Sequence, residues 1–331
     1  MATIKEVAKM AGVSPSTVSR VMAGKIYVEP DKVDQVMQAM ETLNYHPNPL
    51  AKGLRVGRAN MLGVILPDIS NTFFSLLIKS IETHAAKNGY SIMLSNTNED
   101  AKQEKIALQQ LSESYIDGLA IIPVCYKAET FDMLNKRKIP YVLVNRWTTE
   151  NVNCVSNDQR GGCYDVMQYL IKCGHRKISV MFRSFEQDFY RDRYNGCMDA
   201  LKEHGLAACE KYFLHDVNSL EESQQAVENM LAQDDRPTAL FITSEIFTFG
   251  AYSAIFKRGM SIPKDISVIG FDNLPTSPYM TPPLTTYHQA IERIGEYTVA
   301  NLIKQINKKQ ELPEKTLLRG SIIPRDSVKI L

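Results

Sequence analysis

From residue 60 to the C-terminus, short apolar runs alternate with longer stretches that carry apolar residues at helical spacing. The apolar runs cover residues 61–66, 90–94, 118–122, 141–144, 178–182, 239–242 and 266–269. The helical stretches between them include 73–88, 103–114, 162–173, 194–204, 221–233 and 247–258. This alternation is typical of parallel β-sheets covered by helices, so we expect an α/β architecture for most of the chain.

The composition is typical of a globular protein. Of the 331 residues, 44% are hydrophobic, which supplies ample material for a core, and the length predicts two or three domains. No stretch approaches the roughly 20 apolar residues that span a bilayer, and the N-terminus lacks the apolar segment of a signal peptide. The six cysteines are scattered without a C-x-x-C pair, which favours reduced thiols. We therefore expect a cytoplasmic protein with no membrane partner.

The N-terminal segment differs from the rest in charge and in pattern. Residues 1–58 hold eight lysines and arginines against five acidic residues, whereas the remainder holds 30 against 32. Thr3 and Glu6 form a capping box at the start of one predicted helix. Ser14 and Pro15 suit the start of a second helix, and Pro30 lies near the start of a third. A basic segment of short helices favours a polyanionic partner.

Two short helices joined by a tight turn predict a helix-turn-helix motif. The N-terminal residues of the second helix of such a motif enter the DNA major groove. Ser14, Ser16 and Thr17 are short and polar there, and Arg20 follows one turn later, where it can make a bidentate contact with guanine. The periodicity alone leaves open a small three-helix bundle that binds no nucleic acid.

Several segments along the chain resemble the lac/gal repressor family of bacterial transcription regulators. The matching segments are 2–25 (ATIKEVAKMAGVSPSTVSRVMAGK), 43–55 (LNYHPNPLAKGLR), 63–71 (GVILPDISN), 269–273 (IGFDN), 283–286 (PLTT) and 323–327 (IPRDS). The resemblance implies an all-α helix-turn-helix head followed by a two-lobed α/β ligand domain of the periplasmic-binding-protein type I fold. The expected domains are 1–46, a hinge at 47–59, and 60–331 with interlobe crossings near residues 158, 288 and 320.

The hinge segment predicts a helix too short to be stable alone. Asn48 suits its N-cap and Pro49 its first turn, and only about two turns follow before Gly57. The resemblance implies that this helix forms in the DNA minor groove beside the same helix of a second subunit, with Leu54 as a wedge that kinks the duplex. An alternative is that Leu54 packs on the head. The predicted contacts of the hinge with DNA are Asn48, Ala51, Lys52, Leu54 and Arg55.

A ligand pocket is expected at the carboxyl ends of the strands, where open α/β sheets bind ligands. The resemblance assigns effector contacts to Asp272 and Arg193 and an aromatic wall to Phe73 and Phe74. Asp272 could instead cap a turn, and Arg193 could belong to a structural ion pair. The predicted effector-binding residues are Phe73, Phe74, Asn145, Arg193, Asn218, Ser244 and Asp272. The resemblance favours a sugar or sugar derivative, while Arg146, Arg191 and Arg193 also permit a phosphorylated or carboxylated effector.

The sequence offers no support for catalysis. It has no phosphate-binding loop, no G-x-G-x-x-G, no nucleophile elbow and no metal-ligand spacing among its six histidines. We therefore expect no enzyme activity, no cofactor and no metal. After Arg325 the sequence has no heptad-rich segment of the kind that makes relatives tetrameric, so we expect a homodimer on a pseudo-palindromic operator. The alternatives are a regulator controlled by a partner protein and a ligand-binding module without a DNA role.

Overall fold

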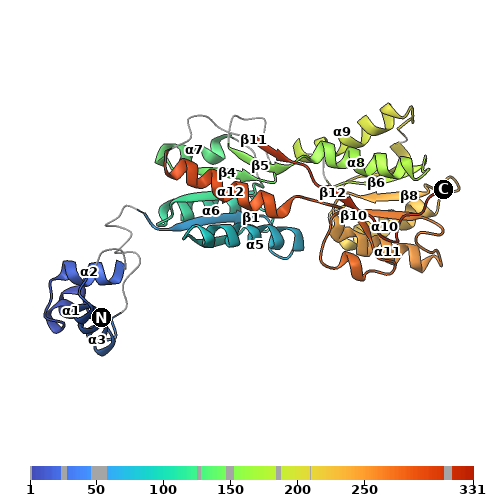
Figure 1. The fold of residues 1–331 in the computed structure, drawn as a ribbon. Helices are drawn as coiled ribbons and strands as arrows, with labels where there is room; N and C mark the ends of the chain where they lie inside the picture. The colour runs from blue at the N-terminus through green and yellow to red at the C-terminus, as the bar shows by residue number, and fades with distance from the viewer. Residues whose placement is uncertain are drawn as a thin grey trace. The chain divides into compact units, whose positions relative to one another are not determined.

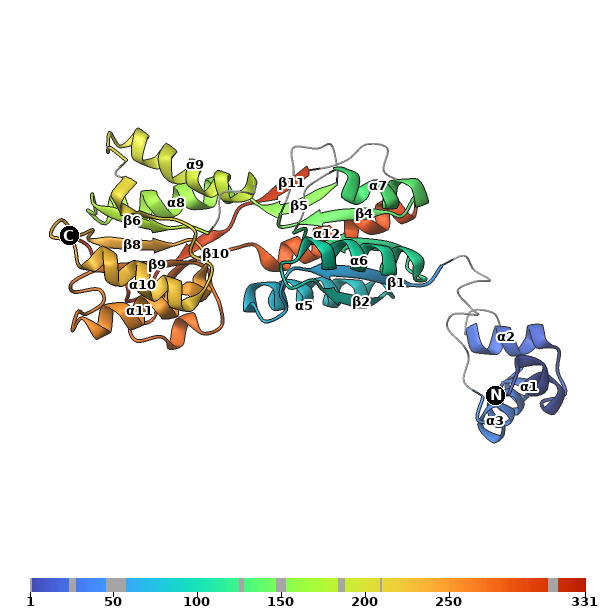
Figure 2. The same ribbon diagram turned by 180° about the vertical axis from the view of Figure 1, so that it is seen from behind.

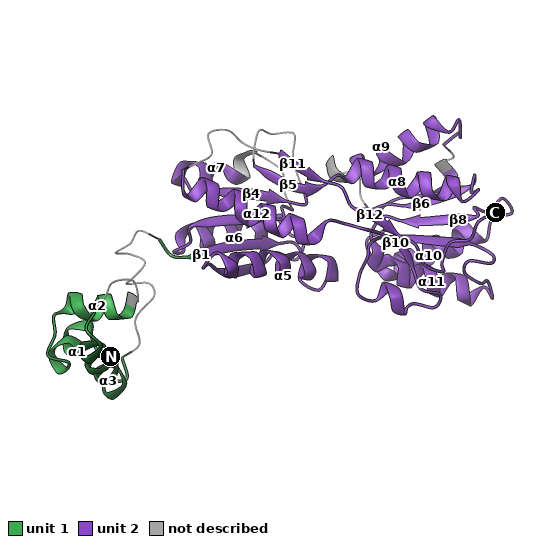
Figure 3. Ribbon diagram, viewed as in Figure 1, with its two compact units in different colours: residues 1–60 green, residues 61–331 purple. Residues whose placement is uncertain are grey.

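The computed structural model describes residues 2–23, 28–45, 58–124, 128–146, 153–183, 188–208, 210–308 and 315–331. The chain divides into two compact units, residues 1–60 and residues 61–331 (Figure 3). Within the described ranges, no helix is long and apolar enough to cross a membrane.

The first unit is a cluster of three helices, α1 (Ile4–Met10), α2 (Pro15–Ala23) and α3 (Pro30–Thr42). The capping box at Thr3 is formed as predicted, because Thr3 and Glu6 each bind the other's backbone N–H. The small core contains Val7, Ala8, Ala11, Val18, Val36 and Ala39. Met37 is 56% exposed, because the buried face of α3 carries positions 36 and 39.

The second unit contains two six-stranded sheets, each the centre of one lobe (Figure 1). Lobe 1 has the strand order β11-β5-β4-β3-β1-β2, and lobe 2 has the order β12-β10-β9-β8-β6-β7. The strands of lobe 1 are β1 (Met61–Leu66), β2 (Ser91–Asn96), β3 (Gly118–Ile121), β4 (Tyr141–Val144), β5 (Cys154–Asn157) and β11 (Lys315–Leu318). Those of lobe 2 are β6 (Ile178–Met181), β7 (Phe213–Leu214), β8 (Ala239–Ile242), β9 (Ser267–Asp272), β10 (Thr285–His288) and β12 (Ser321–Ile323). Adjacent strands are parallel except β10 and β12.

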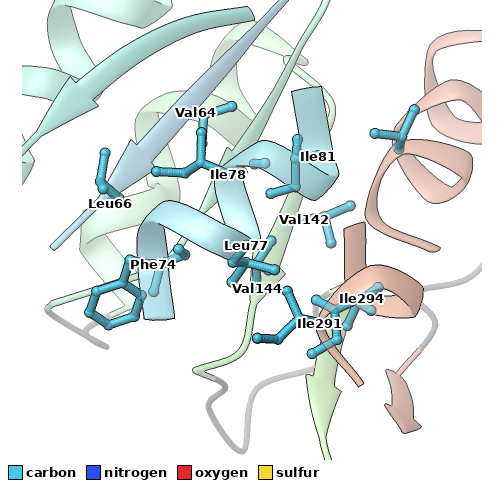
Figure 4. Close-up of a cluster of buried hydrophobic side chains, with 14 of the residues drawn as sticks. Val64, Leu66, Phe74, Leu77, Ile78, Ile81, Val142, Val144, Ile291 and Ile294 are labelled. Carbon is cyan, nitrogen blue, oxygen red and sulfur yellow. The ribbon is translucent and has the colours of Figure 1, made fainter. Parts of the chain in front are cut away.

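Helices flank each sheet (Figures 1 and 2). Those of lobe 1 are α5 (Thr72–Lys87), α6 (Ala101–Glu113), α7 (Ala128–Arg137) and α12 (Ile291–Ile306). Those of lobe 2 are α8 (Gln159–Lys172), α9 (Asp188–Glu203), α10 (Leu220–Leu231) and α11 (Thr248–Lys257), with the short 3-10 helices η1 (Glu210–Tyr212), η2 (Glu245–Phe247) and η3 (Ser277–Tyr279). The apolar run at 61–66 is continuous because β1 is buried on both faces. Val64 and Leu66 pack with Phe74 and Ile294 (Figure 4), and Ile65 packs into the cluster on the opposite face.

The chain passes between the lobes three times. The passages lie between β5 and α8, between β10 and α12, and between β11 and β12. Asp158 in the first passage accepts a hydrogen bond from Gly161 at the start of α8 (2.8 Å) and binds Arg319 of the third passage (2.5 Å). Gly320 donates its backbone N–H to the Tyr287 hydroxyl (2.7 Å), and a Cβ at this position would lie 2.1 Å from the His288 carbonyl oxygen. The three passages therefore pack directly against one another.

We predict that Gly295→Ala destabilises lobe 1. A Cβ at Gly295 would lie 2.2 Å from the Ser80 Oγ and 2.7 Å from the Ser80 carbonyl carbon, so α12 would have to move away from α5. Overpacking costs about 1–3 kcal/mol and the gain in helix propensity returns about 1 kcal/mol, so the expected net loss is about 1 kcal/mol, within a range of about 0–2 kcal/mol. Urea denaturation followed by circular dichroism measures it. Glu296→Ala, at the exposed neighbouring position, is the control. Equal stability of the two variants would show that the contact does not constrain the packing.

Candidate nucleic-acid interface and ligand pocket

The start of α2 presents a cluster of hydroxyl groups. The Ser14 Oγ accepts a hydrogen bond from the Thr17 backbone N–H (3.2 Å) and lies 2.7 Å from the Ser16 Oγ and 2.9 Å from the Thr17 Oγ1. Ser14, Ser16 and Arg20 are exposed, and Thr17 is half-buried, whereas Val18 anchors the other side of the helix in the core. This end of a helix also carries a partial positive charge from its backbone dipole. The arrangement can donate hydrogen bonds to an anionic, groove-bearing partner.

The predicted hinge contacts Asn48, Ala51, Lys52, Leu54 and Arg55 lie at positions 46–57, outside the described residues. They remain sequence-based predictions.

A pocket lies between the two lobes, at the carboxyl ends of their strands, and holds about 340 Å³ of space including its open side. Its lining residues are Asn71, Phe73, Phe74, Asn145 and Arg146 from lobe 1 and Arg183, Tyr190, Arg193, Ser244 and Asp272 from lobe 2. Six of the seven residues expected to bind an effector are therefore brought together. Phe73 and Phe74 meet edge to face, with ring centroids 5.4 Å apart, and form the aromatic side of the pocket.

Asn218 does not line this pocket. It is exposed before α10, where its side chain donates to the Asp216 carbonyl oxygen (2.8 Å) and its backbone N–H donates to Glu222 (2.6 Å). The loop after β7 thus stabilises the start of α10, where Ser219 is the N-cap.

Sequence reasoning did not assign Asn71, Arg183 or Tyr190 to the pocket. Arg183 follows β6, and Asn145 was predicted because it follows a strand. The same argument, that ligands bind at the carboxyl ends of strands, could have identified Arg183. Tyr190 lies one turn before Arg193 on α9, a spacing that places both on one helix face.

Buried amides hold the polar side chains of the pocket in place. The Gln159 Nε2 donates to the Asn145 Oδ1 (3.3 Å), and the Gln159 Oε1 accepts from the Arg193 Nε (2.8 Å). Arg193 also donates to the Thr243 carbonyl oxygen, and its guanidinium carbon lies 4.7 Å from the centre of the Phe271 ring. Since Asn145 belongs to lobe 1 and Arg193 to lobe 2, Gln159 connects ligand-facing groups of both lobes.

Asp272 is buried and accepts hydrogen bonds from the Glu245 backbone N–H (3.1 Å) and from the side chain of Gln289. Burial raises the pKa of Asp272 to about 7, while the positive charge of Arg193 opposes the shift and Glu245 adds to it. The carboxyl can therefore hold or release a proton near neutral pH.

Beside the pocket, the carboxylate of Glu99 contacts an arginine from each lobe. Buried Arg146 makes a two-pronged contact with the Glu99 carboxylate (2.9 and 2.6 Å), and its guanidinium carbon lies 5.3 Å from the Phe74 ring centre. Arg183 of lobe 2 lies 3.6 Å from the same carboxylate. Burial alone would raise the pKa of Glu99, but its hydrogen bonds with Arg146 and the charge of Arg183 hold it below its usual range.

We predict that Asp272 makes stability fall as pH rises from 3.8 to about 7. Over this range the folded state holds the proton more tightly than the unfolded state, so each pH unit costs up to about 1.4 kcal/mol. The free energy of unfolding of the wild type, relative to Asp272→Asn, should decline across this range and then level off. Urea titrations at a series of pH values measure the difference. A difference that does not change with pH would contradict the assignment.

Comparison with known proteins gives matches over almost the whole chain. Residues 3–48 match the family model of bacterial regulatory proteins, lacI family, and residues 59–326 match the model of periplasmic binding proteins and sugar binding domain of LacI family. The HTH-type transcriptional repressor PurR of Haemophilus influenzae (strain PittEE) is 34% identical over 312 residues, which cover 94% of this chain and 93% of that protein.

Two solved structures illustrate the shared fold. A lac repressor dimer bound to operator and the anti-inducer ONPF matches with a TM-score of 0.88 at 24% identity and covers 99% of both chains. A LacI family regulator from Enterococcus faecium with bound ribose matches with a TM-score of 0.74 at 26% identity, covering 82% of this chain and 99% of that one.

Proposed function

The chain belongs to the lacI family of bacterial regulatory proteins, as a DNA-binding transcriptional repressor and not an enzyme, and we propose that it acts as a cytoplasmic homodimer on a pseudo-palindromic operator. We further propose that a small polar effector, a sugar or sugar derivative, occupies the pocket between the lobes. The observation that carries the proposal is the exposed hydroxyl cluster at the start of α2, followed one turn later by Arg20.

This surface suits readout of base edges in the major groove. Ser16 and Thr17 are short enough to let the start of the helix approach, and their hydroxyl groups can donate or accept. Arg20 can bind guanine with two hydrogen bonds. Contacts to phosphates should dominate affinity and make it fall steeply with salt.

Exposed apolar side chains on both lobes support a homodimer. Met93 and Leu94 are 37% and 39% exposed on β2, which is the edge strand of its sheet. Phe249 and Phe256 are 41% and 47% exposed and lie seven residues apart on α11, so they share one face of that helix. An open sheet edge and an apolar helix face are typical of surfaces that a second copy covers.

The pocket chemistry supports a small polar effector that regulates DNA binding. Phe73 and Phe74 offer apolar surface, and Asn145, Arg193 and Asp272 offer converging polar groups, a combination typical of small-ligand sites. The domain model that the chain matches is described as sugar binding, and a relative of the same fold holds ribose. A ligand that touches both lobes favours one lobe orientation, which changes how readily the hinge segments fold on DNA.

Selection of bound duplexes from a random DNA library, with the full-length protein, tests the DNA role. We expect enrichment of a two-fold palindrome with a flexible central base step, because two heads and two wedges would each contact one half-site. Arg20→Ala should lose selectivity at one position of each half-site. If no sequence is enriched, alone or in cell extract that supplies a corepressor, the proposed operator recognition is wrong.

We predict that Leu54→Ala weakens binding to the selected operator by roughly tenfold or more and reduces its bend, because the wedge that unstacks the central step is lost. Fluorescence anisotropy measures affinity, and energy transfer between dyes at the ends of the duplex measures the bend. Leu54→Met keeps an apolar wedge and is the matched control. Wild-type affinity and bend in Leu54→Ala would remove Leu54 from the interface.

A further inference from the structure

Two arginines from opposite lobes face one carboxylate beside the pocket. Arg146 follows β4 in lobe 1 and holds Glu99 with both terminal nitrogens, in the planar two-pronged geometry that suits carboxylates and phosphates. Arg183 follows β6 in lobe 2, and its Nη1 lies 3.6 Å from the Glu99 Oε1. Both arginines also line the pocket, whereas Glu99 does not. The two arginines therefore form a fork that holds a carboxylate at the edge of the pocket.

The carboxylate in this fork is more exposed than the arginine that holds it. Glu99 lies between β2 and α6 with its side chain 29% exposed. Asn98 and Glu99 have φ angles of 53° and 54°, so two successive non-glycine residues adopt the sparsely populated left-handed conformation. Arg146 is better anchored, because it is fully buried and also donates to the Pro123 carbonyl oxygen (3.1 Å). Glu99 is thus the partner that can leave.

Release of Glu99 would leave an excess of positive charge in the pocket. The lining contains the guanidinium groups of Arg146, Arg183 and Arg193. Asp272, the one acidic residue among the described lining residues, is partly neutral at pH 7. Unpaired charge in a buried site is costly, and a neutral sugar supplies no counter-charge. An anionic group supplies it.

We propose that the effector carries a carboxylate or phosphate group, which binds between Arg146 and Arg183 in place of Glu99. The proposal deepens the proposed function, on which it rests, by narrowing the effector to a sugar acid, a sugar phosphate or a molecule of similar charge. Glu99 then acts as a built-in competitor that holds the fork while the effector is absent. The Arg146–Glu99–Arg183 contact and the effector–fork contact are alternatives, and each connects the two lobes.

Inorganic phosphate is the smallest probe of the fork. The full-length protein is titrated with sodium phosphate against sodium chloride at matched ionic strength, and binding is read from calorimetry and from the midpoint of thermal unfolding. We expect saturable binding to the wild type. Arg183→Gln should weaken it by about tenfold or more, since it removes a charged hydrogen bond. Glu99→Gln should strengthen it by about threefold or more, since the competing charge is gone.

Arg191→Gln is the matched control. The sequence admitted Arg191 as a contact for an anionic effector, but the structure places it exposed on α9 and outside the pocket lining. Its phosphate affinity should equal that of the wild type, and operator binding of all variants confirms that they are folded. If phosphate does not bind the wild type, the proposal is wrong. If it binds Arg183→Gln as tightly as the wild type, the proposal is also wrong, and the binding is that of an adventitious ion only.

Binding of glucose, gluconate and glucose 6-phosphate is compared in order to decide whether the anionic group is a carboxylate or a phosphate. Stronger binding of gluconate or of glucose 6-phosphate than of glucose, lost in Arg183→Gln, supports a carboxylate or a phosphate, respectively. If glucose binds as tightly as both anions, the anionic effector is wrong while the proposed repressor function stands. Failure of the proposed function is separate, because it would appear as loss of specific operator binding by the wild type.

Discussion

The side-chain amide of Asn157 connects the passages between the lobes, and the arrangement of the ligand pocket depends on it. Its Nδ2 donates to the side chains of Asn145 (3.4 Å) and Gln289, and its Oδ1 accepts from the Ala290 backbone N–H (2.9 Å) at the start of α12. All of these groups are buried. A buried amide left without partners costs about 1–3 kcal/mol per group, so lobe movements that break these bonds are disfavoured. The lobes are therefore expected to exchange between discrete orientations.

This amide network continues directly into the ligand-facing residues. Gln289 donates to Asp272, and Gln159 joins Asn145 to Arg193, so polar groups that face the pocket from both lobes are positioned by side chains at the passages. A ligand that engages Asp272 or Arg193 changes the charge and hydrogen bonding of groups that the passages hold. In the proposed mechanism, ligand binding changes the lobe orientation through these hydrogen bonds, and no separate mobile segment is required.

The fold could be predicted from the sequence wherever the local pattern was strong. The runs at 61–66, 141–144 and 239–242 coincide with β1, β4 and β8, because strands buried on both faces are continuously apolar. The strands β5 and β11 carry no comparable run, since they include polar residues such as Ser156 and Lys315, and they form because the sheet offers them a partner. The apolar pattern therefore identified the edge strand β2 and the interior strands with continuous apolar runs. It missed the interior strands β5 and β10 and the edge strands β7, β11 and β12.

The pocket was predictable where a residue ends or directly follows a strand, as Asp272 and Asn145 do. It was not predictable where the contact is between distant segments. The ion pair of Glu99 with Arg183 joins positions 84 residues apart on different lobes, and neither flanking sequence carries a signal for the other. Asn218 was wrongly assigned to the pocket, because a polar residue after a strand can form hydrogen bonds at the start of the next helix instead. Strand ends thus indicate which residues can reach the ligand, and only tertiary packing decides which do.

The energy needed for regulation can be compared with what the fork supplies. Shifting a two-state equilibrium from 1:99 to 99:1 requires a difference of about 5.5 kcal/mol in ligand affinity for the two states. A hydrogen bond to a charged group contributes about 1.5–3 kcal/mol, so an anion held by arginines of both lobes in one orientation, and by one arginine in the other, supplies part of this difference for each protomer. In a dimer whose two hinges fold together on one operator, the contributions of two effectors add. Two such sites supply about 3–6 kcal/mol before the displacement of Glu99 is subtracted, so the remaining free energy has to come from other contacts between the effector and the two lobes.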